Sequence, residues 1–140
     1  MRVLGLDVGE RRIGIALSDS LGLTAQRLTV LARRSVAADV EALRALVAQH
    51  QVETIVVGLP LTLRGEQGSQ ADKVVSFVAA LRREVVVPVQ LVDERFTTVQ
   101  GERALLATGT SRRRRKQVID QVAAQLILQH FLDAQRQINR

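Results

Sequence analysis

Residues 3–17 read VLGLDVGERRIGIAL, two apolar runs joined by a short charged turn, and this pattern constrains the fold more than any other part of the chain. The runs at residues 3–8 and 13–18 have the apolar, β-branched character of strands, and residues 9–12 are few enough to connect them as a hairpin. The first run also contains Asp7. A buried carboxylate without a partner is costly or loses its charge, so Asp7 is expected to have a basic partner or a cation.

The rest of the chain alternates between strand-like and helix-like segments. The predicted elements after the hairpin are a strand at 26–32, a helix at 36–49 capped by Ser35, a strand at 54–58 buried on both faces, a helix at 71–81, a strand at 89–92, a helix from residue 97 and a last helix with an apolar stripe at 118–127. Three successive strands followed by strand–helix alternation predict an α/β fold. Its five-stranded mixed sheet has an antiparallel meander and two parallel strands, with helices at its flanks.

Composition limits the classes of function. A chain of 140 residues, of which 46% are hydrophobic, is expected to form a single domain over residues 1–140. The absence of cysteine excludes disulfides and thiolate chemistry and favours a cytoplasmic protein. The N-terminus does not resemble a leader and no apolar run has bilayer length, so no membrane association is expected. The net charge of +6 favours a polyanionic partner such as nucleic acid.

Three acids are predicted to meet at one edge of this sheet. Asp7 lies near the end of the first strand and Glu94 directly follows the strand predicted at 89–92, and groups beyond the carboxyl ends of neighbouring parallel strands converge on one crevice. On a helical wheel, Asp120 lies just past the edge of the apolar stripe of the last helix. Three carboxylates describe a site for Mg²⁺ or Mn²⁺, at which water can attack a phosphodiester.

Each acid also has a simpler interpretation. Asp7 stands before a glycine and could be a turn residue that ends a strand. Glu94 could pair with a neighbouring arginine at the surface, and Asp120 could form an ordinary helical pair with Lys116. Taken together, these interpretations leave unexplained why acids follow the relevant strands in an otherwise basic protein.

The run SRRRRK at residues 111–116 is the only strongly biased segment, and it is expected to lie just before the last helix. Such a run is more often a solvated patch than a binding site. Its position one turn before Asp120 nevertheless favours a phosphate clamp, in which Arg113 and Arg114 contact the nucleic acid. The two histidines lack the spacing of metal ligands, and no serine has the partners of a nucleophile.

Four segments, in this order and spacing, carry a resemblance that covers essentially the whole chain. They are GLDVGERRIGIALSD (5–19), VVGLPLTLRGEQGSQA (56–71), LVDERFTT (91–98) and KQVIDQVAAQLIL (116–128). Through them the chain resembles the YqgF family, also called RuvX, within the RNase H-like superfamily. The resemblance implies an RNase H-like fold with a five-stranded mixed sheet and flanking helices.

The resemblance also implies roles for individual residues. It implies catalytic, metal-binding acids for one or two Mg²⁺ or Mn²⁺ ions at Asp7, Glu94 and Asp120, and nucleic-acid-binding or structural basic residues at Arg12, Arg95 and Lys116. The loop after Pro60 often reads NMDGT in relatives, whereas here residues 62–66 are TLRGE, so no role is carried over to this loop. No acid lies within one turn of Asp120, which favours a site of three acids.

The function implied is hydrolysis of phosphodiester bonds, in maturation of the 5′ end of the small-subunit ribosomal RNA precursor. Resolution of four-way DNA junctions is the alternative, because no motif reports whether the 2′-hydroxyl is recognised. A resolvase is expected to act as a homodimer, whereas a processing nuclease could act as a monomer.

A non-catalytic nucleic-acid-binding module would gain nothing from three acids near phosphate. A sugar-kinase-like phosphate loop would need a second lobe that 140 residues cannot supply.

Overall fold

The computed structural model describes residues 2–61, 64–94 and 112–138, and it describes residues 112–121 only as helix backbone. Five strands form one sheet in the order β3-β2-β1-β4-β5. The strands are β1 (Val3–Val8), β2 (Arg12–Ser18), β3 (Ala25–Ala32), β4 (Thr54–Leu59) and β5 (Val89–Asp93). The sheet predicted from the sequence is therefore confirmed.

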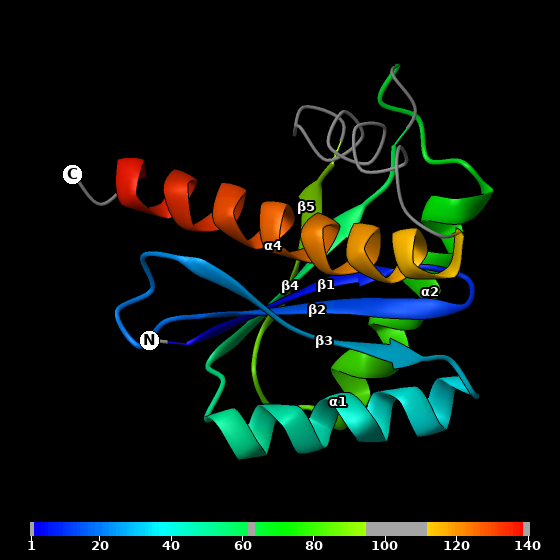
Figure 1. Ribbon diagram of the computed structural model, residues 1–140, viewed down its shortest axis with the longest axis horizontal. Coiled ribbons are helices and arrows are strands. Elements are labelled where there is room, and N and C mark those ends of the chain that lie inside the picture. Colours follow the sequence, from blue (N-terminus) through cyan, green and yellow to red (C-terminus); the bar gives the residue numbers. More distant parts are fainter. Residues whose placement is uncertain (1, 62–63, 95–111, 139–140) are drawn as a thin grey trace.

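Strand direction brings four strand ends to the same edge of the sheet. β2 is antiparallel to both β1 and β3, while β4 is parallel to β1 and β5 is parallel to β4. β1, β3, β4 and β5 therefore all end at one edge, which we call the carboxyl edge. The helices α1 (Val36–His50), α2 (Ser69–Glu84) and α4 (Arg112–Ile138) all begin on this side of the molecule (Figure 1).

The helix α4 begins earlier than the sequence pattern predicts. The basic run was expected before the last helix, but α4 already begins at Arg112, so that expectation is wrong. Arginine and lysine are good helix formers and no glycine or proline separates the run from the apolar stripe, so the helix extends through it. The helix predicted from residue 97 lies outside the described residues. Within the described ranges, none of the helices combines the length and apolar character needed to cross a bilayer.

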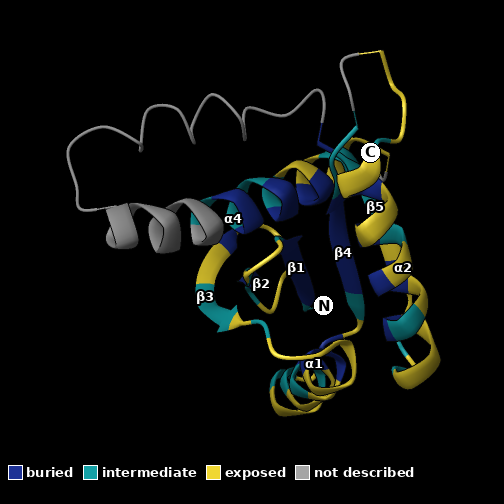
Figure 2. Cartoon of the chain, turned by 90° about the vertical axis from the view of Figure 1, so that its right-hand side faces the viewer, coloured by how far each residue is buried: buried dark blue, intermediate teal, exposed yellow. Residues whose placement is uncertain are grey.

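The sheet has an apolar core on each face. Leu4 and Leu6 of β1 face the core shared with α1 and α2, whereas Val3 faces the core shared with α4. β4 is likewise divided, with Ile55 on the first side and Val56 on the second, as predicted for a strand buried on both faces. Figure 2 shows β1 and β4 as the buried centre of the sheet.

The helix α4 lies unusually close to β1 at Gly5. A Cβ atom at this position would be 2.7 Å from the Cβ of Leu128 and 3.1 Å from the carbonyl oxygen of Ala124. Only a residue without a side chain fits between strand and helix here. Gly5 thereby fixes the distance between α4 and the sheet. Because side chains alternate along a strand, every second residue of β1, counted from Gly5, points toward α4.

We expect Gly5→Ala to lower the free energy of unfolding by about 1–3 kcal/mol, because the added methyl group overpacks this contact. Urea denaturation measures the change. Gly68→Ala is the matched control, since a Cβ there would meet no atom within 4 Å. Its free energy of unfolding is expected to change by no more than about 0.5 kcal/mol. Alanine caps a helix less well than glycine, but it also lowers the entropy of the unfolded chain, and the two effects offset each other. Equal stability of the two variants would contradict the close contact.

Candidate active site

Asp7 is the first acid of the candidate site. It is the next-to-last residue of β1, is 8% exposed and pairs with Gly14 of β2. Only Leu6 separates it from Gly5, so the side chain of Asp7 points to the same face of the sheet, the α4 face. Its neighbour on β2, Gly14, contributes no side chain to this face. The carboxylate therefore lies under α4, at the carboxyl edge of the sheet.

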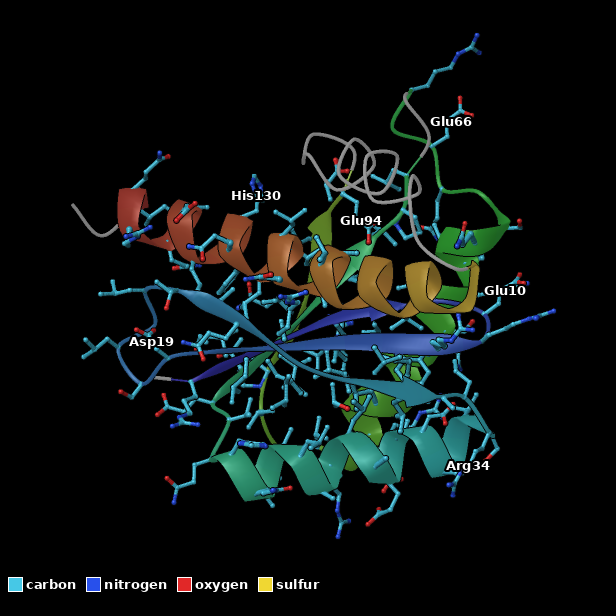
Figure 3. All side chains as sticks on the ribbon, viewed as in Figure 1. Glu10, Asp19, Arg34, Glu66, Glu94 and His130 are labelled. Atoms are coloured by element: carbon cyan, nitrogen blue, oxygen red, sulfur yellow. The ribbon has the colours of Figure 1, made fainter. Side chains whose placement is uncertain are left out.

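Glu94 is the second acid and follows directly after β5. It is 5% exposed, and its backbone N–H donates to the carbonyl oxygen of Leu59 at 3.2 Å. Its side chain crosses over β4, since a Cβ atom on Gly58 would overlap the Glu94 Oε1 and lie 2.6 Å from Cδ1 of Ile127. Figure 3 shows Glu94 projecting from the end of β5 toward α4. The carboxylate thus occupies a space that only glycine at residue 58 leaves open.

The register of the sheet places these two acids side by side. Leu6 of β1 pairs with Val57 of β4, so the next residues along each strand, Asp7 and Gly58, stand at the same level. Adjacent strands are separated by about 4.8 Å, and residues at one level of a parallel pair point to the same face. The carboxylate of Glu94, lying over Gly58, is therefore next to the carboxylate of Asp7 on the α4 face.

The third predicted acid is placed only through its backbone. Asp120 lies in α4, one turn before Ala124 and two turns before Ile127. These two later residues contact β1 and β4 at Gly5 and Gly58. The side chain of Asp120 is outside the described part of α4, and among the described side chains no third acid or histidine joins Asp7 and Glu94. That Asp120 completes the site stays a prediction.

The predicted basic contacts lie around this edge where the structure describes them. Arg12 is the partly buried first residue of β2, and its carbonyl oxygen accepts a 2.8 Å hydrogen bond from the N–H of Gly9. Arg113, Arg114 and Lys116 belong to the first turns of α4, and their side chains are not described. Arg95 lies outside the described residues.

The loop between β4 and α2 does not supply another acid to the pair. Leu61 and Gln67 form an isolated bridge, and Gly65 between them has a φ of 81°. Glu66 is exposed in this loop and lies well apart from Glu94 (Figure 3). The departure of residues 62–66 from the family pattern therefore leaves the loop without an acid at the site.

Two features of the site were missed by sequence reasoning. Gly58 is one, although a glycine at the end of a β-branched buried strand is a known signal of close approach by another group. The ion pair of Arg33 with Asp39 is the other, and it braces the turn after Asp7. No local pattern reports this pair, because the two residues are brought together by the loop between β3 and α1.

The chemistry of the two described acids suits a divalent cation. Two carboxylates that lie together in a mostly buried space repel each other unless a proton, a basic group or a cation intervenes. Carboxylate oxygens are the preferred ligands of Mg²⁺ and Mn²⁺, which bind through few protein groups and keep several waters. The residues present therefore fit a hard-cation site.

Comparison with known proteins agrees with these observations. The family model RuvX, described as Holliday junction resolvase, matches residues 1–134. A relative from Moorella thermoacetica is 56% identical over 133 residues, which is 95% of each chain, and a relative from Natranaerobius thermophilus is 46% identical over 100% of this chain and 98% of its own. Both carry the provisional name pre-16S rRNA nuclease.

Solved structures share the fold at low sequence identity. RuvC of T. thermophilus, in complex with a Holliday junction substrate, matches with a TM-score of 0.62 at 18% identity over 98% of this chain and 96% of that one. The Holliday junction resolvase of fowlpox virus matches with a TM-score of 0.55 at 11% identity over 96% and 99%. This likeness confirms the predicted RNase H-like fold. With the family model and the relatives matching along almost its whole length, the chain belongs to the RuvX family of nucleases, which are hydrolases of phosphodiester bonds.

Proposed function

We propose that this chain cuts nucleic acid in a reaction that depends on a divalent metal held by Asp7, Glu94 and Asp120. The observation that carries the proposal is the pair of buried carboxylates of Asp7 and Glu94, side by side over adjacent strands. A nuclease gains from such a pair, whereas a module that only binds nucleic acid would be weakened by negative charge near phosphate.

Each residue has a definite part in the proposed mechanism. One or two Mg²⁺ or Mn²⁺ ions, when bound, supply activation of water and stabilisation of the charge that develops on the phosphate. The backbone of Asp7 is held in the β1–β2 ladder and that of Glu94 by its hydrogen bond to Leu59, so both carboxylates would need little reorganisation to hold the ions. Arg12, Arg95 and the basic first turns of α4 neutralise flanking phosphates, and the positive end of the helix dipole adds to this attraction.

The proposed substrate is the precursor of 16S rRNA, cut at its 5′ end. Support comes from the relatives with the provisional name pre-16S rRNA nuclease, one of which is 56% identical to this chain. A four-way DNA junction is the second candidate, favoured by the description of the family and by the junction bound to the structurally similar RuvC. Both substrates present the same phosphodiester chemistry to the same acids.

The test offers purified protein the two substrates side by side, with Mg²⁺ and with a chelator. We expect metal-dependent cutting of the precursor RNA and little cutting of the junction, by a protein that a mass measurement shows to be a monomer. Faster cutting of the junction, by a homodimer, would favour the alternative. Binding of either substrate without cutting in Mg²⁺ would contradict the nuclease and support a binding module.

Removal of Arg113 and Arg114 tests the proposed phosphate clamp. We expect Arg113→Ala with Arg114→Ala to flatten the dependence of log affinity on log salt by roughly one to two units of slope, because each arginine releases counterions on binding phosphate. The control, Arg44→Ala with Arg83→Ala, removes the same charge from exposed positions on α1 and α2. If the slope is unchanged in the Arg113/Arg114 variant, or changes equally in both double variants, the basic run is a solvated patch and not a phosphate clamp.

A further inference from the structure

Arg33, the residue directly after β3, forms an ion pair with Asp39 in the first turn of α1. The Nε atom lies 3.0 Å from Oδ2 of Asp39, and the two side chains are 21% and 2% exposed. The second carboxylate oxygen accepts a hydrogen bond from the backbone N–H of Arg34 at 3.1 Å. The guanidinium also lies 5.0 Å from the ring centroid of Phe77. The Arg33 side chain is thus oriented by a carboxylate and an aromatic ring.

The same arginine holds the turn between β1 and β2, residues 9–12. Its Nη1 donates to the carbonyl oxygen of Gly9 at 3.0 Å, and its backbone N–H donates to the carbonyl oxygen of Arg11 at 2.9 Å. Inside the turn, the N–H of Gly9 donates to the carbonyl oxygen of Arg12. Since the turn begins two residues after Asp7 and ends at Arg12, Arg33 connects this part of the candidate site to α1.

A second contact at the turn is weaker. Glu10, at the tip, accepts a 2.9 Å hydrogen bond from Nζ of Lys73 in α2, and this bond lowers the pKa of Glu10 below its ordinary value. Both side chains are about two-thirds exposed, and exposed pairs of this kind contribute little to stability. Figure 3 shows Glu10 at the outer end of the turn and Arg34 pointing away from it. Arg33 is therefore the stronger tether of the turn.

Burial of the Arg33–Asp39 pair is poorly explained by stability alone. The cost of removing two charges from water offsets much of their attraction, and apolar pairs of similar volume often stabilise a fold to a similar degree. An apolar pair could not bind a carbonyl oxygen of the turn. The planar guanidinium, in contrast, donates in two fixed directions at once, here to Asp39 and to Gly9.

We propose that Arg33, oriented by Asp39, is a positioning residue that fixes the β1–β2 turn and thereby holds Arg12 where it meets the phosphate backbone. The inference rests on the proposed function, because it assigns Arg12 to substrate contact. Arg33 itself acts through the turn and does not touch the substrate.

The substitution Arg33→Lys distinguishes the effect of the hydrogen bonds that position the turn from the effect of the positive charge at residue 33. Lysine keeps the positive charge and can still neutralise Asp39, but its single ammonium group cannot reproduce the fork that also reaches Gly9. The control is Arg44→Lys, since Arg44 forms an exposed pair with Glu41 within α1. Two quantities are measured: hydrogen exchange of the Gly9 amide, and affinity for the precursor RNA in a chelator, where no cutting occurs.

We expect Arg33→Lys to speed exchange of the Gly9 amide about tenfold, while amides of the central strands keep wild-type protection. Affinity for the RNA is expected to fall about fivefold, with no further loss when Arg33→Lys is added to Arg12→Ala, because the two residues act as one unit. Arg44→Lys is expected to change neither quantity.

Three results would overturn the inference: unchanged exchange at Gly9, faster exchange throughout the sheet, or full additivity of the losses with Arg12→Ala. The first shows that Arg33 does not fix the turn, the second that it only stabilises the fold, and the third that it acts independently of Arg12. A wild-type protein that neither binds nor cuts RNA would instead defeat the proposed function. In that case the turn would have no role in substrate binding. Exchange of the Gly9 amide would still show whether Arg33 fixes the turn.

Discussion

Asp7→Asn is expected to reduce the rate of nucleic-acid cleavage about 10³-fold, as measured by kcat at saturating Mg²⁺. Asparagine has nearly the size of aspartate, so the packing under α4 is retained while one negative charge is lost. The remaining acids then hold the cation less tightly and in a different position. The loss should appear on RNA and on DNA alike, because the proposed metal site would serve either substrate.

The control for this substitution is Asp133→Asn, the same chemical change in an exposed residue of α4 that contacts Gln129 and Arg136. Cleavage by this variant is expected to equal that of the wild type. If Asp7→Asn also cut at the wild-type rate, the activity would come from another centre or from a contaminant.

Gly58→Ala is expected to lower kcat about 10²-fold, although alanine is the smallest possible side chain. Its methyl group would occupy the place of the Glu94 carboxylate, 2.9 Å from Cδ and closer still to Oε1. Glu94 reaches this place with the end of a flexible side chain, so the carboxylate should move while β4 stays. The free energy of unfolding is expected to fall by only about 1 kcal/mol in urea denaturation.

Gly68→Ala serves as the control here too, because its added methyl group would meet open space at the start of α2. Activity and stability are both expected to stay at wild-type values. Full activity of Gly58→Ala would mean that the Glu94 carboxylate is not needed above β4. Loss of activity together with general unfolding would mean that the contact with Ile127, and not the position of Glu94, dominates.

Much of the framework could be predicted because the relevant signals are local. The β-branched runs marked the strands, and Ser35 was correctly expected to cap α1, where its side chain accepts from the N–H of Ala38 at 3.1 Å. The expectation that Asp7 and Glu94 share an edge needed only strand direction, since carboxyl ends of parallel strands meet on one side of a sheet.

The details of the site could not be predicted because they depend on contacts between distant segments. That Glu94 crosses over Gly58 follows from where β5 ends relative to β4, and no residue pattern reports that register. The start of α4 was misjudged because the basic run was interpreted from its charge, although arginine and lysine are good helix formers and no glycine or proline separates the run from the apolar stripe. Arg33 and Asp39 meet through a loop whose conformation hydrophobic spacing does not encode.

The most direct test of the central claim is a titration of Mn²⁺, by calorimetry or electron paramagnetic resonance, into the wild type and three single variants. These are Asp7→Asn, Glu94→Gln and Asp120→Asn, each of which removes one charge with little change in size. We predict that the wild type binds at least one Mn²⁺ ion and that every variant binds it at least about tenfold more weakly. Wild-type affinity in all three variants would contradict a shared ion, and wild-type affinity in Asp120→Asn alone would remove that residue from the site.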